Sequence, residues 1–238
     1  SKFGSYTGNG STNLIEINFE PAFIIIKKTS GSGDWRVYDN KRGSSSARYP
    51  LYANLNNTEG GGLNEITFLS NGFQLGSASN TNTNGSNYIY IAFGSDASAA
   101  PALPNSFANK LYTGNGNSQS ITGLGFSPSL VWLKQRSGTQ DQMWYDNNRG
   151  AGHYISSNNN NAQGYANSTV TSFDSDGFSV GSSNSENQNS QTFVAWCWKA
   201  GNTWQSNLDG STGSTVNVNT ANGFSIVKWV GTANSQTT

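Results

Sequence analysis

The sequence contains one pattern twice, and this repetition constrains the fold more than any other feature. The segment Tyr6-Thr7-Gly8-Asn9-Gly10 returns as Tyr112-Thr113-Gly114-Asn115-Gly116, and Tyr38-Asp39-Asn40-Lys41-Arg42-Gly43 returns as Tyr145-Asp146-Asn147-Asn148-Arg149-Gly150. The offset is about 107 residues, which indicates two copies of one structural unit. Near the end, Trp229-Val230-Gly231 echoes Tyr112-Thr113-Gly114 and begins a third copy.

The repeats and the polar stretches between them predict the domain organisation. We expect a first repeat over 1–94, a linker over 95–105 that is rich in Ser, Ala and Pro, and a second repeat over 106–201. Residues 202–238 then hold a connector, Asn202 to Ala221, and the first strand of an incomplete third repeat. The chain does not begin with Met, so we expect it to be a piece of something longer.

Apolar residues in each copy follow the pattern of strands. Short apolar or β-branched runs end at Gly, Asn, Ser or Asp, and helical spacing is almost absent. Asn71-Gly72 and Asp176-Gly177 each separate two such runs and predict a β-hairpin in each copy. The sequence therefore predicts an all-β protein made of tandem antiparallel β-sandwich repeats, of the jelly-roll or lectin-like type.

The last strand of each repeat has two apolar faces. Alternation places Val194, Trp196 and Trp198 on one face, where the first copy has Ile89, Ile91 and Phe93. We expect this face to be the core. The opposite face, with Phe193, Ala195 and Cys197 or Tyr88, Tyr90 and Ala92, is expected to be a second packing surface or partly exposed.

The composition disfavours several kinds of partner. Lys and Arg total 13 and Asp and Glu total 13, so the formal net charge is zero and offers no attraction to nucleic acid or to an anionic membrane. The longest apolar runs are far shorter than the ~20 residues that cross a bilayer. The single cysteine, Cys197, forms no disulfide within the chain.

The repeated Tyr-Asp-Asn-x-Arg-Gly segment is the most specific polar feature. In one interpretation the Asp and Arg side chains form a structural clasp that holds a loop against the sheet. In the other they bind sugar hydroxyls beside an aromatic ring. The candidate ligand-binding residues are Tyr38, Asp39, Arg42, Trp144, Tyr145, Asp146 and Arg149. Trp35 and Trp204 are further candidates for an exposed ring.

The sequence shows little sign of a catalytic site or a metal site. His153 is the only histidine and has no counterpart in the first copy, so neither a Ser-His-Asp triad nor a histidine metal site has its second member. Asp174-Ser175-Asp176-Gly177 resembles the start of a calcium loop, but Leu69 and Asn71 replace its acids in the first copy, which favours a turn. We expect no catalytic residues, no metal and no cofactor.

Several longer segments resemble a repeat family found in virion proteins of tailed bacteriophages, especially marine ones, where the repeats are tail-fibre-like. The segments that carry the resemblance are Phe126-x-Pro128 to Lys134, the Tyr-Asp-x-x-Arg-Gly motif, Ser172-Phe173-x-x-x-Gly177-Phe178-x-x-Gly181, Val194 to Gly201, and Asn222 to Val227. The first copy departs from the pattern, because Ile89 to Phe93 replaces the Trp-rich strand.

This resemblance implies a non-enzymatic, extracellular module at the virion surface, in a tail fibre, spike or capsid decoration. It also implies assembly with copies of itself or with other virion subunits, and contact with a host-surface glycan. From the residues alone, a secreted carbohydrate-binding module or bacterial adhesin domain is the alternative. A glycan-degrading enzyme is the third reading.

Overall fold

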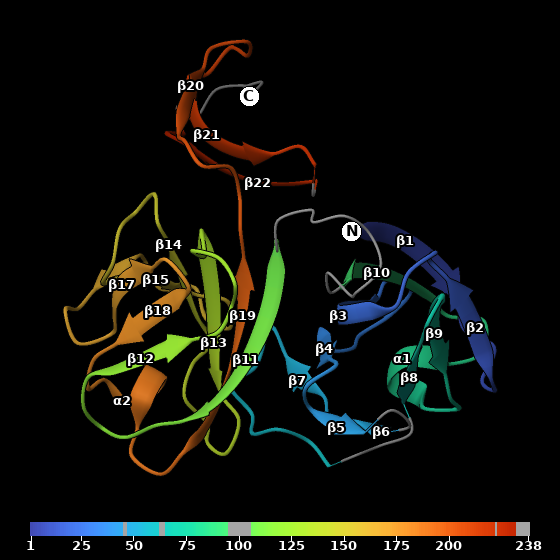
Figure 1. Cartoon of the computed structure of the whole chain (residues 1–238). Coiled ribbons are helices and arrows are strands. Elements are labelled where there is room, and N and C mark those ends of the chain that lie inside the picture. The colour runs from blue at the N-terminus through green and yellow to red at the C-terminus, as the bar shows by residue number, and fades with distance from the viewer. Residues whose placement is uncertain (45–46, 62–64, 95–105, 222, 232–238) are drawn as a thin grey trace.

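The computed structural model describes residues 1–44, 47–61, 65–94, 106–221 and 223–231 of the chain (Figure 1). The fold is all-β, as predicted, and the described strands pair antiparallel throughout. The described helices are two single-turn segments, α1 (Ser79–Asn82) and α2 (Asn184–Asn187). Neither approaches the length that a membrane-crossing helix requires, and none other occurs in the described ranges. The predicted linker, 95–105, and residues 232–238 lie outside these ranges.

The first repeat is a sandwich of a large and a small sheet. The large sheet has the order β1-β10-β3-β4-β7 and the small sheet the order β2-β9-β8. Their strands are β1 (Lys2–Thr7), β2 (Asn13–Glu16), β3 (Pro21–Lys28), β4 (Arg36–Asp39), β7 (Leu51–Tyr52), β8 (Ile66–Leu69), β9 (Gly72–Leu75) and β10 (Asn87–Gly94). A two-stranded ribbon, β5 (Gly43–Ser44) and β6 (Ala47–Arg48), follows the clasp segment.

The second repeat has the same arrangement. Its large sheet has the order β11-β19-β13-β14-β15-β16 and its small sheet the order β12-β18-β17. The strands are β11 (Phe107–Thr113), β12 (Gln119–Thr122), β13 (Leu130–Gln135), β14 (Met143–Asp146), β15 (His153–Ser156), β16 (Gly164–Tyr165), β17 (Val170–Asp174), β18 (Gly177–Val180) and β19 (Thr192–Trp198). The predicted hairpins are confirmed as β8–β9 and β17–β18.

The Tyr-Thr-Gly-Asn-Gly motif ends the first strand of each repeat, and backbone crowding explains its first glycine. A Cβ on Gly8 would lie 2.3 Å from the carbonyl oxygen of Thr83, and one on Gly114 would lie 2.2 Å from that of Gln188. The motif's asparagines, Asn9 and Asn115, then exchange hydrogen bonds with Asn82 and Asn187, which are fully buried. The motif therefore locks the helical turn α1 or α2 to the edge of its own repeat.

The interior of each sandwich is lined by a different face of the last strand from the one predicted. In β10, Tyr88, Tyr90 and Ala92 are buried in the core between the two sheets, whereas Ile89 is 39% exposed. The expectation that Ile89, Ile91 and Phe93 form the core is therefore wrong. In β19, both faces are buried: Ala195 and Cys197 face the sandwich interior, while Trp196 and Trp198 face away from it.

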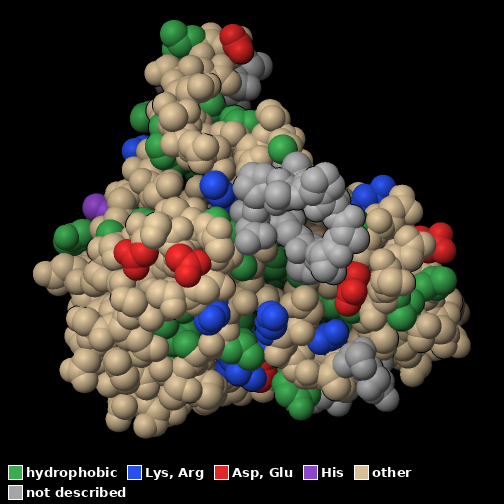
Figure 2. Space-filling model, in the orientation of Figure 1, with side chains coloured by type: hydrophobic (Ala, Val, Ile, Leu, Met, Phe, Trp, Pro, Cys, Tyr) green, Lys and Arg blue, Asp and Glu red, His purple; other side chains and the backbone are tan. Residues whose placement is uncertain are grey.

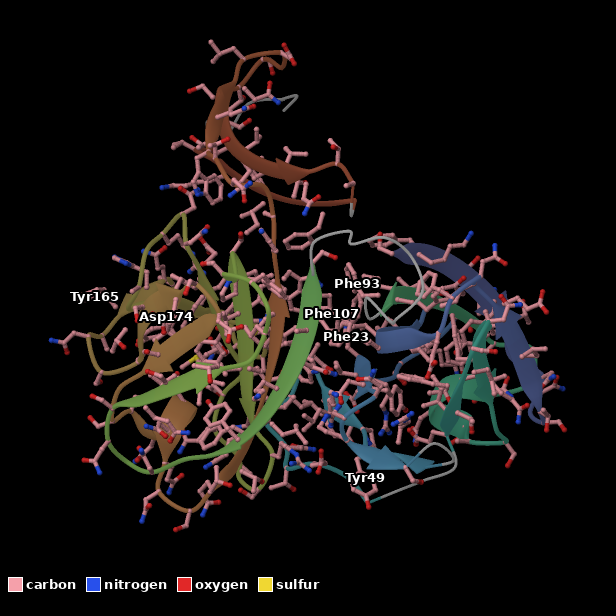
Figure 3. All side chains as sticks on the ribbon, viewed as in Figure 1. Phe23, Tyr49, Phe93, Phe107, Tyr165 and Asp174 are labelled. Carbon is pink, nitrogen blue, oxygen red and sulfur yellow. The ribbon has the colours of Figure 1, made fainter. Side chains whose placement is uncertain are left out.

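The Trp-rich face of β19 packs against the first repeat instead. A third cluster joins the outer faces of the two large sheets, so that four sheets lie in successive layers (Figures 1 and 3). Phe23 of β3 is its centre, with ring centroids 5.5 Å from Trp196, 5.4 Å from Trp198 and 6.1 Å from Trp132. The alternation rule separated the two faces of these strands correctly, but both are apolar, so it did not indicate which face meets which partner.

Hydrogen bonds also cross between the repeats. The indole Nε1 of Trp196 donates to the Asp39 carboxylate at 2.8 Å, and the Gln142 amide donates to the Leu55 carbonyl at 2.9 Å. The Lys134 ammonium donates to the Asn56 carbonyl at 2.9 Å, and its burial lowers its pKa to about 8. The two repeats therefore share a buried interface that is aromatic at its centre and hydrogen-bonded around it.

Residues 202–221 and 223–231 contribute a small three-stranded sheet, which lies above the two repeats in Figure 1. The predicted connector contains two strands, β20 (Gln205–Asn207) and β21 (Ser214–Asn219), which pair in the order β20-β21-β22 with β22 (Phe224–Trp229). Phe224 stacks on Trp198 with ring centroids 6.2 Å apart, which attaches this C-terminal sheet to the two repeats. β22 is an edge strand of the sheet.

Candidate functional site

The first clasp is a buried structural element. Asp39, at the end of β4, accepts the backbone N–H groups of Lys41 and Arg42 at 2.9 and 3.0 Å and the Arg42 Nε at 2.6 Å. Arg42 is 1% exposed and also donates to the carbonyls of Val37 and Tyr49 and to the Glu59 carboxylate. The side chain therefore closes the turn after β4 from inside the protein.

This clasp also takes part in the interface between the repeats. Glu59 accepts from Arg42 at 3.0 Å and from Arg136 of the second repeat at 2.7 Å. Asp39 accepts from Trp196, as described above. Because Tyr38, Asp39 and Arg42 are almost fully buried, a sugar in solvent does not reach them in this structure, which corrects the ligand-binding interpretation of these three residues.

The second clasp has the same local geometry but fewer partners. Asp146 accepts the backbone N–H of Arg149 at 2.9 Å and its Nε at 2.5 Å, and the Arg149 Nη2 donates to the Trp144 carbonyl at 3.0 Å. The Arg149 side chain is 14% exposed. Its Nη1 is buried and has no hydrogen-bond partner among the described residues, whereas the Nη1 of Arg42 bonds Tyr49 and Glu59.

The tyrosines of the two motifs point into the sandwich cores. The Tyr38 hydroxyl donates to the Glu65 carboxylate, and the Tyr145 hydroxyl donates to that of Glu186 at 2.5 Å. Burial and the neighbouring carboxylates raise the pKa of both tyrosines, and burial raises the pKa of Glu186. Neither ring is available to a sugar, because both side chains are 0% exposed.

The three tryptophans proposed as sugar platforms are half-buried. Trp144 packs against Trp132 with ring centroids 4.9 Å apart, and Trp35 and Trp204 are likewise only partly accessible. The exposed tryptophan of the described chain is Trp229, at 55%. Its sequence position had suggested only the start of a third repeat.

The second clasp lies beside a groove of about 350 Å³ that Trp229 also lines. One wall comes from the second repeat and the other from β22 of the C-terminal sheet. The lining residues are Asp146, Asn148, Arg149, Ile155, Gln163, Ile226, Val227, Lys228 and Trp229. Residues from both faces of β22 take part, as expected of a groove that follows the edge of a strand. The motif predicted Asp146 and Arg149, but the β22 wall depends on how the C-terminal sheet docks.

A second cavity, of about 360 Å³, lies where the two repeats and the C-terminal sheet meet. Its walls are mainly apolar and include Phe23, Phe93, Trp144, Trp198 and Phe224. Figure 3 shows Phe23, Phe93 and Phe107 close together between the two repeats. Trp144 therefore belongs to the inter-repeat packing rather than to the groove.

In the acidic Asp174-Ser175-Asp176-Gly177 turn, both carboxylates accept hydrogen bonds from nearby groups of the protein. Asp176 accepts the backbone N–H groups of Gly125 at 2.6 Å and Gly123 at 3.0 Å, and these bonds lower its pKa. Asp174 accepts the hydroxyls of Ser172 and Ser179. Within the described ranges, no group of three or more His, Cys, Asp or Glu side chains has a metal-binding arrangement.

Comparison with known proteins gives a family for this architecture. No curated protein and no solved structure matches the chain. A family model does match, and it covers residues 1–96 and 104–238, which include both repeats and the C-terminal sheet. The chain therefore belongs to the family described as a domain of unknown function, DUF7483.

Proposed function

We propose that this chain is a non-enzymatic structural module of a bacteriophage virion surface protein, such as a tail fibre, spike or capsid decoration, and that it contributes to attachment to the host surface. The observation that carries the proposal is the buried aromatic interface between the repeats, with Phe23, Trp132, Trp196 and Trp198 at its centre. It joins two sandwiches into one continuously packed body, which suits a part that must transmit force or hold a fixed geometry.

The use of charge supports a structural role. A chain of ion pairs crosses between the repeats, from Asp39 through Arg42 and Glu59 to Arg136. The buried carboxylates of Glu65 and Glu186 accept tyrosine hydroxyls. In a chain with 11% charged residues, these groups stabilise the fold from within. Figure 2 shows few charged side chains on the face in view; several Lys and Arg side chains gather below its centre, and most of the remaining surface is uncharged.

The C-terminal sheet supports assembly with further copies or other virion subunits. Leu208, Trp229 and Val230 are 78%, 55% and 76% exposed, and β22 is an edge strand. Proteins usually cover exposed apolar edges through pairing or packing. An extracellular location at the virion surface is part of the same proposal.

The experiment is to locate the chain on particles. Purified virions of the phage that encodes it are analysed by mass spectrometry and by immunogold electron microscopy with antibodies against the chain. We expect peptides of the chain in the particles and gold on their outer surface. Peptides confined to the lysate, with particles unlabelled, would contradict the proposal.

A secreted carbohydrate-binding module or bacterial adhesin domain is the second candidate. The observation that favours it is Trp229, an exposed ring beside a groove that also contains amide and charged side chains. The same antibodies distinguish the two, because a module of this class is found in the culture medium or on bacterial cells without any particle.

A further inference from the structure

The groove between the second clasp and β22 differs from the matching region of the first repeat in one chemical respect. In the first repeat, Arg42 is held by two carboxylates, with Nε 2.6 Å from Asp39 and Nη1 3.0 Å from Glu59. In the second repeat, Arg149 bonds only one carboxylate, Asp146, and its Nη1 has no partner among the described residues. Among the described residues, the Arg149 guanidinium therefore has no second carboxylate equivalent to Glu59, which pairs with Arg42.

The position of Arg149 gives a ligand a route to this group. Arg149 lines the groove of about 350 Å³, whereas Arg42 is sealed inside the protein. The Nη1 atom itself is buried, so its bonding to a ligand carboxylate requires a change of side-chain rotamer in the groove wall, which is common when proteins bind. A guanidinium binds a carboxylate strongly and in a defined orientation.

The other groove residues suit a sugar that carries this carboxylate. Trp229 is 55% exposed and offers an apolar ring face, and the amides of Asn148 and Gln163 are donors and acceptors for hydroxyls. Lys228 is exposed and adds a positive charge, while Asp146 is already paired with Arg149. The groove thus combines a net positive charge, an exposed aromatic ring and two side-chain amides, which match the carboxylate, the ring face and the hydroxyls of an acidic sugar.

We propose that this groove binds a carboxylate-bearing saccharide, of the uronic-acid class, whose carboxylate takes at Arg149 the place that Glu59 takes at Arg42. The inference deepens the attachment part of the proposed function and rests on it. It assigns the ligand contact to Arg149, Lys228 and Trp229 rather than to the buried Tyr-Asp-Arg motif of the first repeat.

The test compares two ligands that differ only at the carboxyl group, which is a carboxylate in one and a hydroxymethyl group in the other. The chain is titrated calorimetrically with a galacturonate trimer and with the same trimer after reduction of its carboxyl groups. We expect the acidic trimer to bind at least about tenfold more tightly, since the charge-assisted hydrogen bonds are lost with the carboxylates. Equal affinities, or no binding of either trimer, would overturn the proposal.

Surface variants separate the site from the fold. Trp229→Ala is expected to weaken binding about fivefold or more, and Tyr165→Ala, which changes an exposed ring that does not line the groove, to leave it unchanged. Figure 3 shows Tyr165 at the outer edge of the second repeat. Unchanged binding in Trp229→Ala would count against the groove.

Gln163→Glu tests the comparison with Glu59 directly. Gln163 is exposed and lines the groove, so this variant supplies a carboxylate from the chain itself. We expect it to abolish binding of the acidic trimer, because the added negative charge stands in the groove and repels the carboxylates of the ligand. Full binding in this variant would overturn the assignment to Arg149.

A polyglutamate peptide completes the experiment. Tighter binding of the peptide than of the acidic trimer would overturn the saccharide class, whereas weaker binding supports it. These titrations do not depend on where the chain is found. Absence of the chain from virions therefore contradicts the proposed function, and absence of trimer binding contradicts this inference alone.

Discussion

At the scale of single residues, each repeat has a buried glutamate that accepts a tyrosine hydroxyl, but the glutamate comes from a different position in each repeat. Glu65 in the first repeat and Thr169 in the second occupy equivalent positions, because the carbonyl of each accepts the backbone N–H of a matching glycine, Gly76 or Gly181. Thr81 and Glu186 form a second equivalent pair, because the carbonyl of each accepts the hydroxyl of a matching tyrosine, Tyr6 or Tyr112. The first repeat has Glu then Thr, and the second has Thr then Glu. In each repeat, the glutamate accepts a hydrogen bond from the tyrosine hydroxyl of the Tyr-Asp-Asn-x-Arg-Gly motif, Tyr38 or Tyr145.

This exchange predicts a compensating pair of substitutions. Glu186→Thr leaves the Tyr145 hydroxyl without its acceptor and is expected to lower the free energy of unfolding by about 1–3 kcal/mol. Adding Thr169→Glu gives the second repeat the arrangement of the first and is expected to recover most of the loss. Urea denaturation of both variants measures this, and additive destabilisation in the double variant would contradict it.

At the scale of elements, the turns after β4 and β14 share a sequence motif but differ in how far they are built into the protein. Arg42 has acceptors on Asp39, Val37, Tyr49 and Glu59, and it is buried. Arg149 has acceptors on Asp146 and Trp144 and is partly exposed. The same clasp thus anchors the repeat interface in one copy and borders a groove in the other.

Thermal and urea unfolding of Arg42→Ala and Arg149→Ala should therefore differ. Removing Arg42 leaves the fully buried Asp39 carboxylate without its cation, while Glu59 keeps Arg136, and is expected to cost about 3–5 kcal/mol. Removing Arg149 leaves one partly accessible carboxylate and is expected to cost about 1–2 kcal/mol. An unchanged melting temperature in either variant would show that its clasp does not hold the turn.

At the scale of the whole molecule, a buried interface couples the packing of the two repeats. Phe93 of the first repeat and Trp196 of the second both pack against Phe23, and hydrogen bonds such as that from Trp196 to Asp39 cross the boundary. Opening this interface would expose Trp132, Trp196 and Trp198 to water. We therefore expect the repeats to unfold together rather than one after the other.

Phe23→Ala tests this coupling. The cavity it leaves is expected to lower the free energy of unfolding by about 3–5 kcal/mol, in a single transition that tryptophan fluorescence and circular dichroism report alike. Leu14→Ala, at a position 54% exposed, is the control and should change stability by no more than about 0.5 kcal/mol. Two separated transitions would mean that the repeats fold independently.

The sequence by itself determined the features that neighbouring residues decide. The duplication is visible in the repeated segments themselves, and the all-β class in the spacing of apolar residues. The hairpins at Asn71-Gly72 and Asp176-Gly177, and the pairing of Asp39 with Arg42 and of Asp146 with Arg149, depend on turn chemistry and short spacing. These interactions form within a few residues along the chain, so the pattern carries them.

Only the tertiary structure decided which apolar face meets which partner. Both faces of β19 are apolar, and the docking of the repeats sends Trp196 and Trp198 to the interface and Cys197 to the sandwich core. The groove at Arg149 likewise exists because β22 lies beside the second clasp. The hydrophobic effect is non-directional, so any apolar partner can bury an apolar face. The alternation of residues along a strand therefore defines its two faces but not which sheet packs on each.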